Sequence, residues 1–408
     1  MSLVFIVADS VRHDILGCYG GMARTPTIDR LAGEGNLFER VVSAAPWTVP
    51  SVASMLTGVY AHRLGLAKWE QPWPSEHPTL FELAASAGYK VASFVFDPSH
   101  LFRRVPSAGV AGSSQNTSSI LSWLRNHRDD RFLLFIHYWW THVPYVAKPM
   151  TTSAWLQVTN RVLATMRSGQ KAKEGVKKLY RLAVEKFSEE WLPLVLAEID
   201  MDTTWLLLTA DHGESWGERA QTTKLKDVFD LHGNTLYDEV IRVPLIVHPP
   251  GGAKPRRISG MTRTVDLLPT LTELMSLSQV SGGLDGISLA DCIRTGSPPP
   301  IETAISVANR DFVDLPDLPE KPADLWSSFA LTTGRHKQIW EPSTNRRVTF
   351  DLENDPNETI DVSADYAELL ELGWRKLEEE LTRARVGNVL TEDTRRIRER
   401  LRRLGYID

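Results

Sequence analysis

Short apolar runs alternate with segments of helical spacing over residues 1–250 of the chain. The five runs are "LVFIVAD" (3–9), "KVASFVF" (90–96), "RFLLFIHYW" (131–139), "TTWLLLTAD" (203–211) and "VPLIVHP" (243–249). Unbroken apolar runs of this length are typical of parallel strands that are covered on both faces. Because the segments between them, such as "TPTIDRLAGEG" and "TLFELAASAG", have the period of amphipathic helices, the pattern predicts an α/β fold with a doubly wound, mostly parallel central sheet flanked by helices.

The pattern changes twice further along the chain. Residues 150–200 are rich in Lys, Leu, Ala and Glu, which predicts a helical insertion over the edge of the sheet. From about residue 300, short runs such as "ETAISVAN" and "HKQIWEP" predict antiparallel strands, and "ADYAELLELGWRKLEEELTRAR" predicts an amphipathic helix that packs on them. We therefore expect a large α/β domain over residues 1–298 and a small α+β subdomain, with an antiparallel sheet and helices, over residues 299–408.

Composition and charge narrow the functional classes. The 408 residues are 42% apolar and 24% charged, as in ordinary globular proteins. The formal charge of -5 is spread without a dominant basic stripe, so we expect no nucleic-acid partner. Cys18 and Cys292 lie far apart and fit neither a disulfide framework nor a zinc motif. The apolar run at residue 3 is too short for a signal peptide or a transmembrane segment, and we expect a cytoplasmic protein.

Polar residues follow several of the predicted strands at their carboxyl ends. Asp9 ends the first run, His142 follows the third, and Asp211 and His212 end the fourth. In doubly wound sheets, ligands bind at this edge. The convergence of carboxylates and imidazoles on one edge therefore predicts an enzyme. Gly213 would allow the chain to turn sharply after His212.

Asp9, Asp211 and His212 form a set that suits one divalent metal ion, with Ca²⁺, Mg²⁺, Mn²⁺ and Zn²⁺ all chemically open. Thr48, in "APWTVPSVASMLTG", could supply a further metal ligand. A hydroxyl bound to such an ion loses its proton more easily and could attack a phosphorus or sulfur centre. The alternative is that Thr48 caps the helix that follows. The two roles are compatible, because amides at a helix N-terminus also attract anions.

Two further histidines are candidates for catalysis. His142 lies in "HYWWTHVPY" and His232 in "DLHGNTLYDE", beside proline or glycine. We expect His142 to protonate the leaving oxygen and His232 to contact the transferred group. The alternative is that both are buried structural histidines.

Other side chains could contact the substrate. Arg12, Arg63 and Asn234 are candidate contacts to an anion, with surface or capping roles as the alternative. Three tryptophans flank the candidate residues, and they could stack on a substrate or pack in the core; they are Trp47, Trp139 and Trp140.

With these residues assembled, the chain resembles the sulfatase family of the alkaline phosphatase superfamily. "FIVADSVRHDILGCYG" is similar to the opening strand with its metal aspartate, and "TVPSVASMLTGVYAHRLG" to the nucleophile signature. "THVPY" resembles the His-x-Pro-Tyr element, "TADHGESWGE" the second metal motif, and "LHGNTLYDEVIRVPLIVHPPG" continues the pattern. The resemblance spans most of the chain and implies the family's fold and its metal site.

The chain departs from the family pattern at several site positions. Thr48 stands where sulfatases carry the Cys or Ser that becomes formylglycine, Val52 stands in place of the arginine, and Ser10 in place of the second aspartate of a pair. The lysine and histidine that often follow "GYKVAS" are absent from "FVFDPSH". Threonine is the nucleophile in phosphodiesterases and phospho-alcohol transferases of the superfamily.

The resemblance therefore implies a metal-dependent hydrolase that acts on a small-molecule or carbohydrate anionic ester through Thr48. Since an unmodified hydroxyl suits phosphorus, we expect phosphate mono- or diesters to be favoured over sulfate esters. Two alternatives remain open: a phosphoryl or phospho-alcohol transferase, and a non-catalytic binding member of the fold.

Overall fold

A mixed β-sheet forms the centre of the computed structural model, which describes residues 1–67, 71, 73–74, 76–96, 105, 109–146, 152–167, 170–218, 231–278, 280, 282–309 and 326–385. Within these residues the sheet has nine strands, in the order β4-β3-β5-β1-β6-β8-β2-β7, with β9 beside β2. The strands are β1 Ser2–Ala8, β2 Asn36–Val42, β3 Lys90–Val95, β4 Val110–Ser113, β5 Phe132–Tyr138, β6 Thr204–Thr209, β7 Arg242–Val243, β8 Leu245–His248 and β9 Arg256–Arg263.

The strand directions confirm a mostly parallel sheet and correct one part of the prediction. β3, β5, β1 and β6 are parallel neighbours, as expected. The predicted strand at 243–249 instead runs antiparallel to β6 and β2, as β8. An apolar run reads the same in either direction, so periodicity cannot set strand polarity. β2 and β9 were not predicted, because charged residues such as Glu39 and Arg40 interrupt their apolar pattern.

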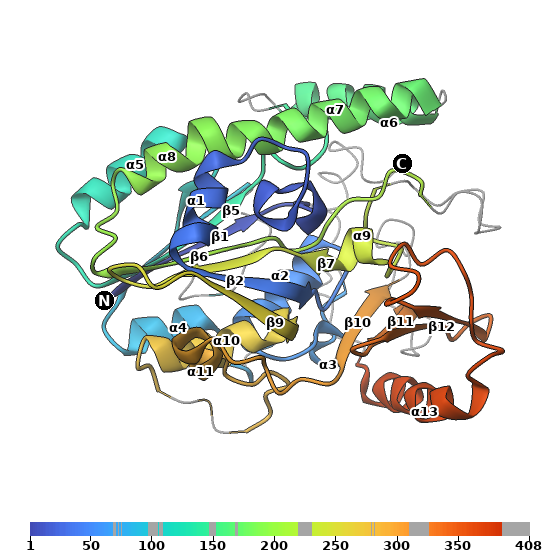
Figure 1. The fold of residues 1–408 in the computed structure, drawn as a ribbon. Coiled ribbons are helices and arrows are strands. Elements are labelled where there is room, and N and C mark those ends of the chain that lie inside the picture. The colour runs from blue at the N-terminus through green and yellow to red at the C-terminus, as the bar shows by residue number, and fades with distance from the viewer. Residues whose placement is uncertain are drawn as a thin grey trace.

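Helices cover both faces of the sheet (Figure 1). α2, α4, α10 and α11 lie on one side, and α1, α5, α7 and α8 on the other. The α-helices are α1 Pro26–Glu34, α2 Thr48–Thr57, α3 Ala61–Leu64, α4 Leu80–Ser86, α5 Thr117–Asn126, α6 Thr152–Arg167, α7 Gln170–Lys186, α8 Leu192–Leu196, α9 Asp238–Ile241, α10 Leu267–Leu274, α11 Ala290–Thr295 and α13 Ala367–Arg383. Shorter helical turns are η1 His13–Ile15, η2 Gly17–Tyr19, η4 Phe187–Trp191 and η5 Thr264–Asp266. None of the described helices combines the length and apolarity needed to cross a bilayer.

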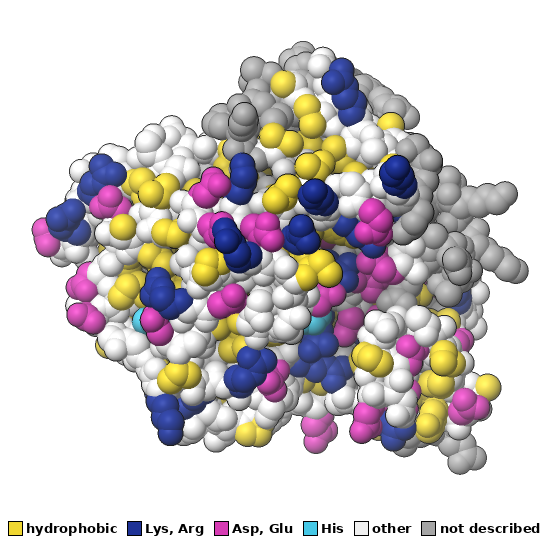
Figure 2. Space-filling model, turned by 45° about the horizontal axis from the view of Figure 1, so that its top comes forward, with side chains coloured by type: hydrophobic (Ala, Val, Ile, Leu, Met, Phe, Trp, Pro, Cys, Tyr) yellow, Lys and Arg dark blue, Asp and Glu magenta, His cyan; other side chains and the backbone are white. Residues whose placement is uncertain are grey.

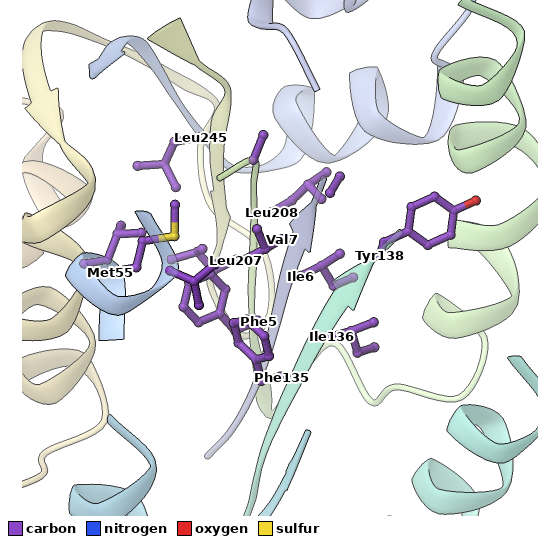
Figure 3. Packing of buried hydrophobic residues seen from close by; sticks show 14 of the residues in the cluster. Phe5, Ile6, Val7, Met55, Phe135, Ile136, Tyr138, Leu207, Leu208 and Leu245 are labelled. Atoms are coloured by element: carbon purple, nitrogen blue, oxygen red, sulfur yellow. The ribbon is translucent and has the colours of Figure 1, made fainter. Parts of the chain in front are cut away.

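Alternate residues of the central strands face opposite helical layers. Phe5 lies level with Phe135 and Leu207, and Figure 3 shows this set on the side of Met55 in α2. The next residues along the strands, including Ile136, point toward the other layer (Figure 3). There the ring of Tyr138 packs on Phe187 and Trp191, which follow α7. The apolar runs are therefore unbroken because both faces of the strands are buried.

A small antiparallel sheet with the order β10-β11-β12-β13 follows the large one, as predicted. Its strands are β10 Ala304–Asn309, β11 Trp326–Thr332, β12 His336–Glu341 and β13 Arg346–Asp351. α13 buries Leu370, Trp374 and Leu377 against Trp326 and Phe329 of this sheet. The apolar stripe of the predicted amphipathic helix thus packs where it was expected to pack.

The contacts that join the small sheet and α13 to the large domain include three that involve buried polar side chains. Trp47 Nε1 donates a hydrogen bond of 2.6 Å to Asn309 Oδ1 at the end of β10. Lys337 is fully buried and pairs with Asp238 and Glu358. The third contact, between α3 and α13, is an ion-pair network in which Arg63 pairs with Asp285 and with Glu380. On the face seen in Figure 2, basic and acidic side chains are interspersed over the described residues.

Candidate active site

The register of three parallel strands places a histidine and two aspartates on one face of the sheet. His137 of β5 lies level with Val7 of β1, which lies level with Thr209 of β6. Asp9 and Asp211 each follow two residues later. Because side chains alternate along a strand, all three side chains are directed toward the α2 side of the sheet. Ser10, with φ of 59°, turns the chain away after Asp9.

The cluster is tight and buried. His137 Nε2 lies 3.3 Å from Asp211 Oδ2 and 3.4 Å from Asp9 Oδ2. His212 Nε2 lies 3.5 Å from Asp211 Oδ2 and 3.7 Å from Asp9 Oδ1. One ligand atom from each of Asp9, His137 and Asp211 lies within 4.8 Å of the others. The structure thus brings together the predicted Asp9, Asp211 and His212, and adds His137, which was not predicted.

The electrostatics of the cluster favour the binding of a cation. Burial and the neighbouring Asp211 raise the pKa of Asp9 well above its usual value. Burial also acts to raise the pKa of Asp211, but His212 and His137 hold it below its usual value. Asp9 Oδ2 is buried and accepts no hydrogen bond within the described residues. Two adjacent buried carboxylates, one with an unsatisfied oxygen, together with imidazoles, fit a divalent cation.

Thr48 is the first residue of α2, and its hydroxyl faces the cluster. Thr48 Oγ1 lies 3.4 Å from His212 Nε2. The capping role considered for Thr48 is wrong: Trp47, in an extended conformation, occupies the cap position, and no side chain caps the helix. The start of α2 is instead held by Ser51 Oγ, which donates to the main-chain oxygen of Asp211 at 2.7 Å. This bond ties the candidate nucleophile to the candidate metal ligands.

His142 and His232 both lie beside the cluster. The His142 ring is 5.1 Å from the His232 ring, which is 4.4 Å from the His212 ring. His142 Nδ1 donates to the carbonyl of Val143 at 2.7 Å, and burial and His232 hold its pKa well below the usual value. Trp139 stacks on His142 at 4.0 Å. His142 is therefore neutral near pH 7.

A fully buried carboxylate, Glu214, orients His232. His232 Nδ1 donates to Glu214 Oε1 at 2.8 Å, and Tyr145 Oη donates to Glu214 Oε2 at 2.8 Å. Burial lowers the pKa of His232, but Glu214 outweighs it and the net shift is upward. Glu214 was not singled out in the sequence, although it stands two residues after His212.

Gly213 is required by a close approach of two backbone segments rather than by a sharp turn. The backbone of Gly213 does not have a positive φ. A Cβ atom at Gly213 would lie 2.2 Å from the main-chain oxygen of Glu239. The turn after His212 therefore needs no left-handed backbone at Gly213, and the close approach to Glu239 is what requires a residue without a side chain there.

The three predicted anion contacts, Arg63, Arg12 and Asn234, lie in different surroundings. Arg63 pairs with Asp285 and bonds Glu380 of α13 at 2.8 Å, which gives it a structural role away from the cluster. Arg12 bonds the main-chain oxygen of Glu214 at 2.9 Å. It also pairs with two acidic side chains and lines a groove of about 520 Å³. Asn234 is half-buried. The amide of the preceding residue, Gly233, donates a hydrogen bond to the carbonyl of Pro46, close to Thr48 in the chain.

The three predicted tryptophans have separate surroundings. Trp47 bonds Asn309, and Trp139 lies between Phe96 and His142, with both stacking distances at 4.0 Å. Trp140 lines a different groove of about 580 Å³. The "DPSH" part of the segment where the family lysine and histidine are missing lies outside the described residues.

Comparison with known proteins places these features in a family. The sulfatase family model matches residues 2–103 and 113–277. The uncharacterized sulfatase YidJ of Escherichia coli K12 is 21% identical over 68% of the chain and 68% of its own length. An ulvan-active sulfatase of Formosa agariphila is 23% identical over 73% of the chain and 66% of its own length. The chain thus spans about two thirds of the length of these curated relatives.

Solved structures have the same fold. A protein whose structure was solved in complex with its substrate D-glucosamine-2-N,6-O-disulfate superposes with a TM-score of 0.70 and 19% identity, over 94% of this chain and 97% of that one. The phosphonate monoester hydrolase of Agrobacterium radiobacter superposes with a TM-score of 0.70 and 18% identity, over 93% of this chain and 95% of that one. With a family model that covers more than half of its residues, the chain belongs to the sulfatase family of the alkaline phosphatase superfamily.

Proposed function

We propose that the chain is a metal-dependent hydrolase of anionic esters, with Thr48 as a covalent nucleophile and with phosphate mono- or diesters favoured over sulfate esters. The observation that carries the proposal is the Thr48 hydroxyl at the start of α2, 3.4 Å from His212 Nε2 and beside the buried aspartates. The names of the relatives, sulfatases and a phosphonate monoester hydrolase, support hydrolysis of such an ester.

Asp9, Asp211, His212 and Thr48 would hold one divalent cation, which supplies Lewis-acid stabilisation of charge on a substrate oxygen. Amides in the first turn of α2 lack partners within the helix and can bind an anionic group. Val52, which stands at the position of the family arginine, is fully buried in the core. Anion binding at this helix end would therefore rely on backbone amides rather than on that arginine.

The side chains suggest how a substrate ester would be cleaved. The Thr48 hydroxyl would lose its proton to solvent, and its oxygen would bond to phosphorus as the ester oxygen leaves. Water would then attack phosphorus, releasing the phosphoryl group and returning a proton to the Thr48 oxygen. The Glu214 carboxylate stabilises a protonated His232, which suits His232 as the proton donor to the leaving oxygen. This exchanges the roles first expected for the two histidines, since His142 is kept neutral by burial.

The substrate class rests on the nucleophile. A threonine cannot become the aldehyde that sulfatases use, so the hydroxyl itself must attack. The Formosa relative is named an ulvan-active sulfatase, and one protein of the same fold is described with D-glucosamine-2-N,6-O-disulfate as its substrate, which keeps a carbohydrate ester among the candidate substrates.

Turnover of nitrophenyl sulfate, phosphate, phosphodiester and phosphonate tests the proposal. We expect Thr48→Ala to abolish turnover of every ester that the wild type cleaves. Thr57→Ala, which removes a hydroxyl bonded to Ala53 at the other end of α2, is the matched control and should stay active. Undiminished activity of Thr48→Ala would remove Thr48 as the nucleophile, and sulfate turnover far above phosphate turnover would reverse the order of substrates.

A further inference from the structure

His137 stands in none of the sequence motifs that resemble the family, yet it lies closer to both carboxylates than His212 does. Its Nε2 is 3.3 Å from Asp211 and 3.4 Å from Asp9, against 3.5 Å and 3.7 Å for His212. We propose that His137 binds the cation directly, in place of the carboxylate that the family carries at Ser10, and that the site therefore prefers Zn²⁺ or Co²⁺ over Ca²⁺ or Mg²⁺. The inference rests on the proposed function only in that a divalent ion binds between Asp9 and Asp211.

The first argument is geometric. Ser10 Oγ donates a hydrogen bond of 2.7 Å to Asp9 Oδ1 and is itself fully buried, so Ser10 satisfies one oxygen of Asp9. The other oxygen, Asp9 Oδ2, accepts no hydrogen bond within the described residues. It is the Asp9 oxygen that pairs with His137 Nε2, at 3.4 Å. An ion at this point would contact an unsatisfied carboxylate oxygen and the imidazole together.

The second argument is the charge and chemical type of the donors. Two carboxylates and two neutral imidazoles carry a total charge of about -2, which balances a divalent ion; a further aspartate at position 10 would exceed it. Ca²⁺ takes six to eight oxygen ligands, and Mg²⁺ takes octahedral oxygens and water. Imidazole suits Zn²⁺ and related ions. Exchanging a carboxylate for His137 therefore moves the donor set from oxygen toward nitrogen.

The alternative role for His137, as an outer partner of the metal ligands, predicts a different effect on metal affinity. His137 could donate hydrogen bonds to the two aspartates without touching the ion, as outer ligands of metal sites do. Such a partner orients the carboxylates for any cation, so its loss would weaken Zn²⁺ and Ca²⁺ alike, by about 10- to 100-fold. Loss of an inner imidazole would instead lower the Zn²⁺ affinity selectively.

Metal binding to the full-length, metal-free protein tests the inference without any substrate. Zn²⁺ and Ca²⁺ affinities would be measured by calorimetry for the wild type, His137→Gln and Ser10→Asp. Gln keeps a hydrogen-bond donor at residue 137. Asp tolerates the positive φ at residue 10. His248→Gln, at another buried strand histidine outside the cluster, is the matched control, and thermal unfolding reports whether each variant is folded.

We expect the wild type to bind Zn²⁺ more tightly than Ca²⁺. The ratio of the two affinities should fall about 10-fold or more in His137→Gln and stay unchanged in His248→Gln. Pulsed electron paramagnetic resonance of the Cu²⁺-loaded protein should show two bound imidazoles in the wild type and one in His137→Gln. If His137→Gln fails to fold, the wild-type spectrum still tests the inference, since a single bound imidazole would overturn it. Ser10→Asp should raise the Ca²⁺ affinity and lower the ratio.

Two results would contradict different claims. An unchanged Zn²⁺ to Ca²⁺ ratio in the folded His137→Gln variant, or tighter Ca²⁺ than Zn²⁺ binding by the wild type, overturns the inference and leaves the proposed hydrolase standing. A wild-type protein that binds no divalent ion overturns the proposed function itself.

Discussion

Replacing Glu214 with glutamine tests how the site prepares His232 for proton donation. Glu214 is fully buried and accepts bonds of 2.8 Å from both His232 and Tyr145. A hydrogen bond to a charged group contributes about 1.5–3 kcal/mol, and the amide of glutamine would keep a neutral bond of about 1 kcal/mol. The difference, about 0.5–2 kcal/mol, corresponds to a fall in kcat of about 2- to 30-fold when proton donation limits the rate.

The assay compares two phosphate esters that differ in their leaving groups. An alkyl alcohol needs a proton as it departs, whereas nitrophenolate does not, so Glu214→Gln should slow the alkyl ester and hardly affect the nitrophenyl ester. Tyr145→Phe removes the second bond to Glu214 but keeps its charge, and it should slow both esters only slightly. An equal loss of kcat on both esters in Glu214→Gln would refute the role of Glu214 and assign it to structure alone.

Two further changes test the contacts that support the site. Gly213→Ala places a Cβ 2.2 Å from the main-chain oxygen of Glu239 and should lower the free energy of unfolding by about 1–3 kcal/mol in urea titrations. Gly33→Ala, where the new Cβ meets open space, is the control and should not lower it. Equal stabilities of the two variants would show that the backbone at Gly213 moves to accept the Cβ. Glu380→Gln should cost about 3 kcal/mol at pH 7 because Arg63 and His62 both lose a buried carboxylate partner, while Arg63 keeps Asp285. Burial acts to raise the pKa of Glu380, but His62 and Arg63 lower it from 4.5 to about 2. The contribution of Glu380 to stability is therefore complete above pH 4.5 and disappears as the pH falls toward 2. A difference in stability between variant and wild type that persists at the lowest pH would contradict this.

The pattern of apolar runs predicted most of the fold, but it could not predict the direction of a strand or identify strands that contain charged residues. The runs at 3–9, 90–96, 131–139 and 203–211 became neighbouring parallel strands because they are apolar on both faces. The run at 243–249 has the same texture and the opposite direction, which depends on long-range pairing.

The site was partly visible for a similar reason. Asp9, Asp211 and His212 could be found because they end apolar runs, where a charge is conspicuous. His137 lies inside such a run and was counted as part of the strand. A polar residue one position before the end of a buried strand, level with residues that lie two positions before the two aspartates, is the signal that could have found it. Glu214 had no such signal, because its partner His232 comes from a distant loop.

The register of β5, β1 and β6 also has a consequence for how the protein matures. His137 and Asp211 are 74 residues apart, and Asp9 comes from the first strand of the chain. Such distant pairings form slowly, so the cluster exists only once the middle of the sheet is complete. A shift of one residue in any of the three strands would turn its ligand to the opposite face. If the proposed cation binds, it would bind only sheets with the correct register and would stabilise them over misaligned sheets by mass action.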